Sequence, residues 1–190
     1  AVCGNGAGNG VPYPRANRET VLALLEACAR ADGVFLYQGH SESGALDDPE
    51  AASLLLEPLT ADTIVAEQLS MGELVRAIRR SALGRMPRRA AFLSCGSGVA
   101  SQPYDATGIA MAALAGGSDA VVSTLRPISD DGPWSTLVND LVETLLSAEP
   151  WQMFGHWQQQ VAPQLESLDE DARRTVASLA MFGAPFVPPS

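Results

Sequence analysis

Short apolar runs alternate with longer amphipathic segments along this chain, and the alternation restricts the folds that the chain can adopt. Three runs have the length and the β-branched or aromatic content of buried strands: residues 34–38, 90–95 and 120–125. Strands separated by helices of about ten or more residues need crossover connections, which pair the strands in parallel and cover both faces of the sheet. The sequence therefore predicts an α/β fold with a mostly parallel central sheet and helices on both faces.

The spacing of apolar residues predicts the remaining elements. Five segments have the spacing that puts apolar groups on one face of a helix: residues 17–32, 71–83, 105–115, 133–147 and 151–165. The second segment follows Ser70, and Glu73 stands three residues later, as in a capping box. Two further apolar runs, residues 52–56 and 176–182, are predicted as additional strands.

Length and charge limit the domain count and the partners. The 190 residues, 46% of them hydrophobic, suit one globular core. The net charge of −10 would repel nucleic acid and anionic lipid, so neither is an expected partner. No run approaches the roughly 18 apolar residues of a membrane span. Three irregularly spaced cysteines predict neither a disulfide framework nor a metal pair, so we expect a cytoplasmic protein without a cofactor.

The beginning of the chain differs in composition from the rest. Residues 1–16 are rich in Gly, Asn and Pro and are predicted to be a loop or flexible lead-in, whereas residues 17–190 are expected to form the domain. The chain begins with Ala, which suggests a processed product or part of a larger protein. The glycines of GNGAGNG, residues 4–10, do not fit the dinucleotide-binding pattern GxGxxG and are predicted to be plain loop.

A histidine and a cysteine stand where two of the predicted strands end. His40 comes two residues after the run 34–38, and Cys95 is the last residue of the run 90–95. In parallel sheets the reactive groups gather beyond the carboxyl ends of the strands, so the two side chains are expected at the same edge. An imidazolium stabilises a neighbouring thiolate, which is a competent nucleophile near neutral pH. The pair therefore predicts nucleophilic catalysis by Cys95 with His40 as the proton donor.

The segments around this pair resemble a known family. YQGHSESG at residues 37–44 and FLSCGSG at residues 92–98 resemble the His and Cys boxes of CHAT-domain peptidases, which are relatives of caspases and separases. Residues 108–131 and 177–185 also resemble that family. The resemblance implies a caspase-like three-layer sandwich and a cysteine endopeptidase that cleaves a protein or peptide substrate. It also implies regulated proteolysis, with activity held in check by a regulatory domain or partner protein.

Two positions depart from the family pattern. Ser41 follows His40 where the family usually has a Gly that lends its amide to the oxyanion hole, and Ser can supply the same amide. Ser94 stands directly before Cys95, where the family usually has Ala. We expect the oxyanion contacts to come from the backbone of Gly39, Ser41 and Gly96, because amides beside glycines are accessible to a substrate.

Two acidic residues suggest a substrate preference. Asp130 and Asp131 follow the predicted strand 120–125, at the sheet edge expected for the catalytic pair. A carboxylate binds a guanidinium through two parallel hydrogen bonds, so cleavage is predicted after Arg or Lys. Alternatively, Asp131 caps the helix that begins near Pro133, which makes Asp130 the better candidate.

Two other functions compete with the peptidase. A catalytically silent caspase-like interaction module would keep the fold without the chemistry, although both boxes here retain their His and Cys. A serine hydrolase would pair Ser97 with His156, but Cys95 occupies the first Gly position of the GxSxG elbow. The sequence therefore favours the cysteine peptidase.

Overall fold

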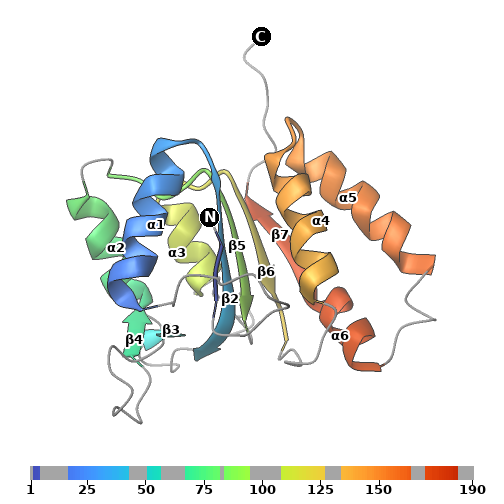
Figure 1. Cartoon of the computed structure of the whole chain (residues 1–190), viewed down its shortest axis with the longest axis horizontal. Coiled ribbons are helices and arrows are strands. Elements are labelled where there is room, and N and C mark those ends of the chain that lie inside the picture. The colour runs from blue at the N-terminus through green and yellow to red at the C-terminus, as the bar shows by residue number, and fades with distance from the viewer. Residues whose placement is uncertain are drawn as a thin grey trace.

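The protein has an α/β fold built on one mixed sheet of seven strands (Figure 1). The computed structural model describes residues 2–4, 17–42, 51–56, 67–81, 84–94, 108–126, 134–163 and 170–183. The strands are β1 Val2–Gly4, β2 Val34–Glu42, β3 Ser53–Leu56, β4 Glu67–Ser70, β5 Arg89–Ser94, β6 Ala120–Thr124 and β7 Leu179–Gly183. The helices are α1 Arg18–Arg30, α2 Met71–Arg80, α3 Ile109–Ala115, α4 Trp134–Leu146, α5 Pro150–Val161 and α6 Glu170–Ser178.

The centre of the sheet is parallel and its edges are antiparallel. Strands follow the order β4-β3-β2-β5-β6-β7, and β1 pairs with β2 beside this path. The pairs β1–β2, β2–β5 and β5–β6 are parallel, whereas β2–β3, β3–β4 and β6–β7 are antiparallel. The predicted parallel pairing of the three central runs is confirmed. The sheet as a whole is mixed: β3 and β4 pair antiparallel beside β2, and β7 pairs antiparallel with β6 although α4, α5 and α6 lie between them in the chain.

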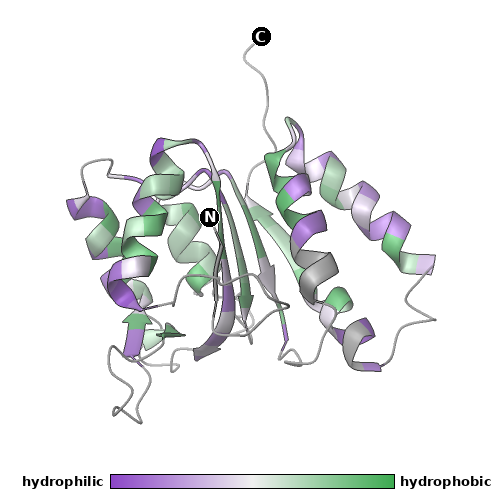
Figure 2. Ribbon diagram, in the orientation of Figure 1, coloured by the Kyte–Doolittle hydropathy of each residue, from purple (hydrophilic) through white to green (hydrophobic). Residues whose placement is uncertain are grey.

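Helices cover both faces of the sheet, as predicted. In Figure 1, α1, α2 and α3 lie on one side of the strands and α4, α5 and α6 on the other. Side chains alternate between the two faces along a strand. In β2, Phe35 and Tyr37 therefore join the core beneath α1 to α3, while Val34 and Leu36 join the core beneath α4 to α6. Figure 2 shows the resulting hydrophobic strands between helices whose outer sides are more hydrophilic.

Helix α2 starts with the predicted capping box. The Ser70 hydroxyl accepts a hydrogen bond from the amide of Glu73, and the Glu73 carboxylate accepts one from the amide of Ser70. Arg18, the first residue of α1, donates to Glu73 at 2.9 Å and to Glu67 of β4 at 3.0 Å. These bonds hold the start of α1 against β4 and the start of α2.

Several elements differ from the sequence prediction, and helix α6 was not predicted. Strand β2 continues through His40 to Glu42 because pairing with β3 keeps this polar stretch extended. The predicted last strand begins only at Leu179, since Val176 lies in α6. Two short strands were missed: β4, and β1 within the predicted lead-in. Helix α3 confirms the helix predicted over residues 105–115 from Ile109 onward, and residues 105–107 lie outside the described part of the chain.

Within the described residues, no helix has the length and apolar character needed to cross a membrane.

Candidate active site

His40 lies near the carboxyl end of β2, inside the strand, which continues beyond the predicted end at residue 38. Its side chain is exposed, and its backbone pairs with Leu55 of the antiparallel neighbour β3. On the other side of β2, the parallel register with β5 places Gly39 opposite Ser94. The residue before His40 is thus the direct neighbour of the residue before Cys95.

The other predicted site residues divide into two groups. Gly39 and Ser41 are half-buried in β2, and Ser41 pairs with Leu54 of β3. Cys95, Gly96, Asp130 and Asp131 lie outside the described residues. The geometry of the His40–Cys95 pair, the oxyanion contacts and the role of the two aspartates therefore stay predictions.

Tyr37 forms hydrogen bonds to the backbone near the end of β2, on the face of the sheet that α1, α2 and α3 cover. Its ring is fully buried, and its hydroxyl lies 3.0 Å from the carbonyl oxygen of His40 and 2.7 Å from that of Leu55. One hydroxyl proton is shared between these two acceptors. The ring lies across Gly39, where an added Cβ would come within 2.7 Å of the hydroxyl oxygen. The absence of a side chain at Gly39 therefore makes room for Tyr37, which the sequence had explained by substrate access alone.

Thr124 forms a similar hydrogen bond to the backbone at the end of β5. This residue ends β6, is fully buried, and donates a hydrogen bond from its hydroxyl to the carbonyl oxygen of Ser94. The adjacent amide of Leu125 donates to Ser178 at 2.8 Å, which ties the end of β6 to the end of α6. Backbone carbonyls on both sides of the candidate site are thus held by buried hydroxyl groups.

Ser94 carries an unusual side chain for its position. Its hydroxyl is completely buried at the end of β5, and among the described residues no hydrogen-bond partner reaches it. Leaving a buried hydroxyl unpaired costs about 1–3 kcal/mol. Ser94 is also one of the two positions, with Ser41, at which the sequence differs from the pattern that it resembles.

The charge near His40 comes from the same strand. Glu42 follows two residues later, on the same face of β2, and accepts a hydrogen bond from Gln68 of β4 at 3.1 Å. Over the described part of the chain, no group of three or more His, Cys, Asp or Glu side chains could hold a metal ion.

Tyr37 and Thr124 are the positioning residues that sequence reasoning missed. Both were predicted only as parts of buried strands. Neither lies in a sequence motif that predicts its hydrogen bond. A hydroxyl group within the last two residues of an apolar run was the available signal, because a buried hydroxyl must find a partner.

Comparisons of this chain with protein-family models and with curated proteins find no match. The resemblance to CHAT-domain peptidases therefore rests on the motif residues themselves.

Proposed function

We propose that this protein is a cysteine endopeptidase in which Cys95 is the nucleophile and His40 the acid–base partner. The observation that carries the proposal is the parallel register of β2 and β5, which sets Gly39 opposite Ser94. His40 follows Gly39 and Cys95 follows Ser94 in the sequence. The Cα atom of each is therefore about 3.8 Å from a member of this registered pair. Side chains alternate along strands, and a continued β5 would turn Cys95 to the face of β2 that carries His40.

The proposed chemistry needs only these two side chains and backbone amides. The Cys95 thiolate attacks the carbonyl carbon of the scissile peptide bond, and the tetrahedral oxyanion is held by backbone N–H groups. When the C–N bond breaks, the protonated His40 ring gives its proton to the leaving amine. His40 then takes a proton from the water that attacks the thioester carbon, and breaking of the C–S bond releases the acid product and returns Cys95 as a thiolate beside protonated His40.

The exposure of His40 supports a role in such chemistry. A histidine that served only the core would be buried, whereas this ring is open to solvent at the carboxyl end of a central strand. Its backbone is fixed on two sides, by β3 and by the Tyr37 hydroxyl. A fixed backbone and an accessible ring suit a catalytic base, because both positioning and proton exchange are needed.

A caspase-like arrangement and a basic substrate preference belong to the same proposal. The fold class is supported by the adjacent parallel strands β2, β5 and β6 with helices on both faces. The preference for Arg or Lys rests on Asp130 and Asp131, which follow β6 in the chain. Arg126 is exposed just after β6, so the carboxylates must outweigh this positive charge.

The decisive experiment measures the reactivity of Cys95 in the purified chain. Iodoacetamide labelling near pH 7, followed by peptide mapping, should show Cys95 reacting faster than Cys28, which is buried and donates to Val34. His40→Ala should slow the labelling of Cys95 about tenfold or more, because the thiolate loses its counter-charge. His156→Ala, which removes the other histidine of the chain, should leave the rate unchanged.

Peptide cleavage provides the functional test. Cys95→Ala and His40→Ala should each abolish cleavage of a fluorogenic peptide library, and the double variant should be scarcely worse than either. Arg and Lys should be preferred at the cleaved position, and Asp130→Ala should reduce that preference more than Asp131→Ala. Equal labelling rates with and without His40, together with no cleavage by the wild type, would support the silent interaction module instead.

A further inference from the structure

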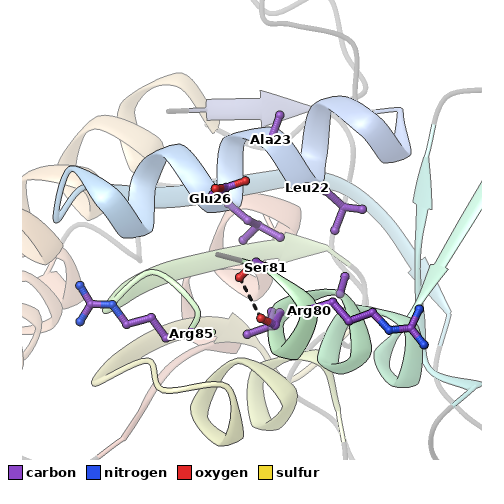
Figure 3. Close-up of a pocket in the computed structure, with 9 residues that line it drawn as sticks. Leu22, Ala23, Glu26, Arg80, Ser81 and Arg85 are labelled. Carbon is purple, nitrogen blue, oxygen red and sulfur yellow. Dashed lines mark hydrogen bonds between the residues drawn. The ribbon is translucent and has the colours of Figure 1, made fainter. Parts of the chain in front are cut away.

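A pocket opens between α1 and α2 (Figure 3). Its volume is about 360 Å³, which lies in the range typical of ligand sites. The floor is apolar and formed by Leu22 and Leu25 of α1 and by Ala77 and Ile78 of α2. Leu25 and Ile78 are buried core residues, so the floor is part of the rigid body of the protein.

Two arginines stand at opposite ends of this floor. Figure 3 shows the Arg80 guanidinium beyond one end and the Arg85 guanidinium beyond the other. Both side chains are exposed, and Arg85 donates to the carbonyl oxygen of Ala29 at 3.3 Å. The acidic side chain of the pocket, Glu26, already forms an ion pair with Arg30 at 2.7 Å. The two ends of the pocket are therefore positive, and its own carboxylate is neutralised.

The charge around the pocket contrasts with that of the chain. The chain has 22 acidic and 12 basic residues, all of the latter arginines, yet residues 76–89 contain six arginines and no acidic residue. Of these six, Arg88 pairs with Asp119. Arg76, Arg79 and Arg80 are exposed and make no ion pair with any described residue. Exposed arginines clustered beside an apolar pocket present a positive surface to an approaching ligand.

We propose that this pocket binds an acidic peptide segment whose centre is apolar and whose ends carry carboxylates. The apolar floor would take aliphatic or aromatic side chains, and each end would offer a guanidinium for a charge-assisted pair with a carboxylate. Arginine is enriched at peptide and protein interfaces for this reason. Nucleic acid fits less well, because the floor is apolar and the chain as a whole is strongly acidic. This site is separate from the proposed active site and does not depend on it.

The test uses the full chain and three fluorescein-labelled peptides. The first peptide has leucines and one phenylalanine at its centre and two glutamates at each end. The second has lysines in place of the glutamates, and the third has serines in place of the apolar centre. Fluorescence anisotropy should show binding of the first peptide alone, weakening as salt rises because the end contacts are exposed.

Variants locate the binding in the pocket. Arg80→Glu and Arg85→Glu should each weaken binding of the first peptide about tenfold, because a like charge replaces a partner. Ala23→Trp, which places an indole at an exposed lining position, should block it. Arg79→Glu and Ala27→Trp are the matched controls, since both residues are exposed on the same helices but do not line the pocket. Ala27→Trp should bind like the wild type, and Arg79→Glu should weaken binding clearly less than Arg80→Glu, because Arg79 adds to the positive surface without lining the pocket.

Three outcomes would overturn the proposal. Equal binding of the lysine peptide would remove the role of charge complementarity. An equal loss in Arg79→Glu and Arg80→Glu would indicate a diffuse field and no defined site. Self-association of the chain that Ala23→Trp abolishes, measured by sedimentation, would identify a second copy as the occupant.

Discussion

Gly39 occupies the tightest place next to the candidate site. Its missing side chain leaves room for the buried ring of Tyr37, whose hydroxyl holds the carbonyl groups of His40 and Leu55. Gly39→Ala should lower the free energy of unfolding by about 1–3 kcal/mol, because the new methyl group must displace a buried ring. Urea denaturation followed by circular dichroism measures this loss.

Two controls separate this clash from a general effect of removing a glycine. Gly155→Ala in α5 meets no atom within 4 Å and should raise stability by about 0.5–1 kcal/mol, as expected in a helix interior. Tyr37→Phe removes the atom nearest to the added methyl group. In that background, Gly39→Ala should cost clearly less than in the wild type. An equal cost in both backgrounds would mean that the Tyr37 hydroxyl is not the obstacle.

At the scale of elements, Glu73 connects three of them. It belongs to the capping box of α2 and accepts a hydrogen bond from Arg18 of α1, which also binds Glu67 of β4. The Arg18 guanidinium, followed by the amide of Ser70, lowers the pKa of the Glu73 carboxyl below its usual value of 4.5. Because the pKa is lower in the folded state, the charged carboxylate stabilises that state fully at pH values above the usual pKa. That contribution is lost as the pH falls through the lower, folded-state pKa.

Glu73→Gln should therefore destabilise the protein by about 1 kcal/mol at pH 7, a magnitude typical of a lost cap and an exposed ion pair. The difference from the wild type should begin to shrink as the pH falls below the usual carboxyl pKa, where the unfolded state takes up the proton first, and should be lost below the lower, folded-state pKa. Urea denaturation at pH 7 and near pH 3 measures both values. Glu143→Gln, exposed on α4 and without an ion pair to a described residue, is the control. A constant difference at both pH values would contradict the ionic contribution.

The sequence predicted those elements whose signals are local. The capping box of α2 and the parallel runs β5 and β6 are specified by residues within or next to them. The extension of β2 through His40, by contrast, depends on pairing with β3. No residue in the extended stretch predicts this pairing. Helix α6 was not predicted, and the start of β7 was misplaced for a related reason. Val176 is apolar in either state, and only the antiparallel ladder with β6 shows where the strand starts.

The candidate site was predicted to a similar degree. The position of His40 at the carboxyl end of a central strand, beside β5, follows from strand order and direction. The hydroxyl contacts of Tyr37 and Thr124 could not be predicted, because each joins residues on different strands. Their partners are known only once the register of the sheet is known.

At the scale of the whole molecule, one sheet separates two cores. Leu74 is buried on the side of α1 to α3, and Leu141 is buried on the side of α4 to α6. All three tryptophans of the chain lie in α4 and α5, on the Leu141 side only. Tryptophan fluorescence therefore reports one face, whereas far-ultraviolet circular dichroism reports the whole fold.

If the shared sheet makes the two cores one cooperative unit, a change on either face must shift both signals. Leu74→Ala and Leu141→Ala should each cost about 2–5 kcal/mol and lower the urea midpoint by about 1 M or more. The decisive variant is Leu74→Ala, which lies across the sheet from the tryptophans. Its fluorescence and circular dichroism transitions should coincide, since coincident probes are the mark of two-state unfolding. A fluorescence midpoint unchanged by Leu74→Ala would show instead that the two faces unfold separately.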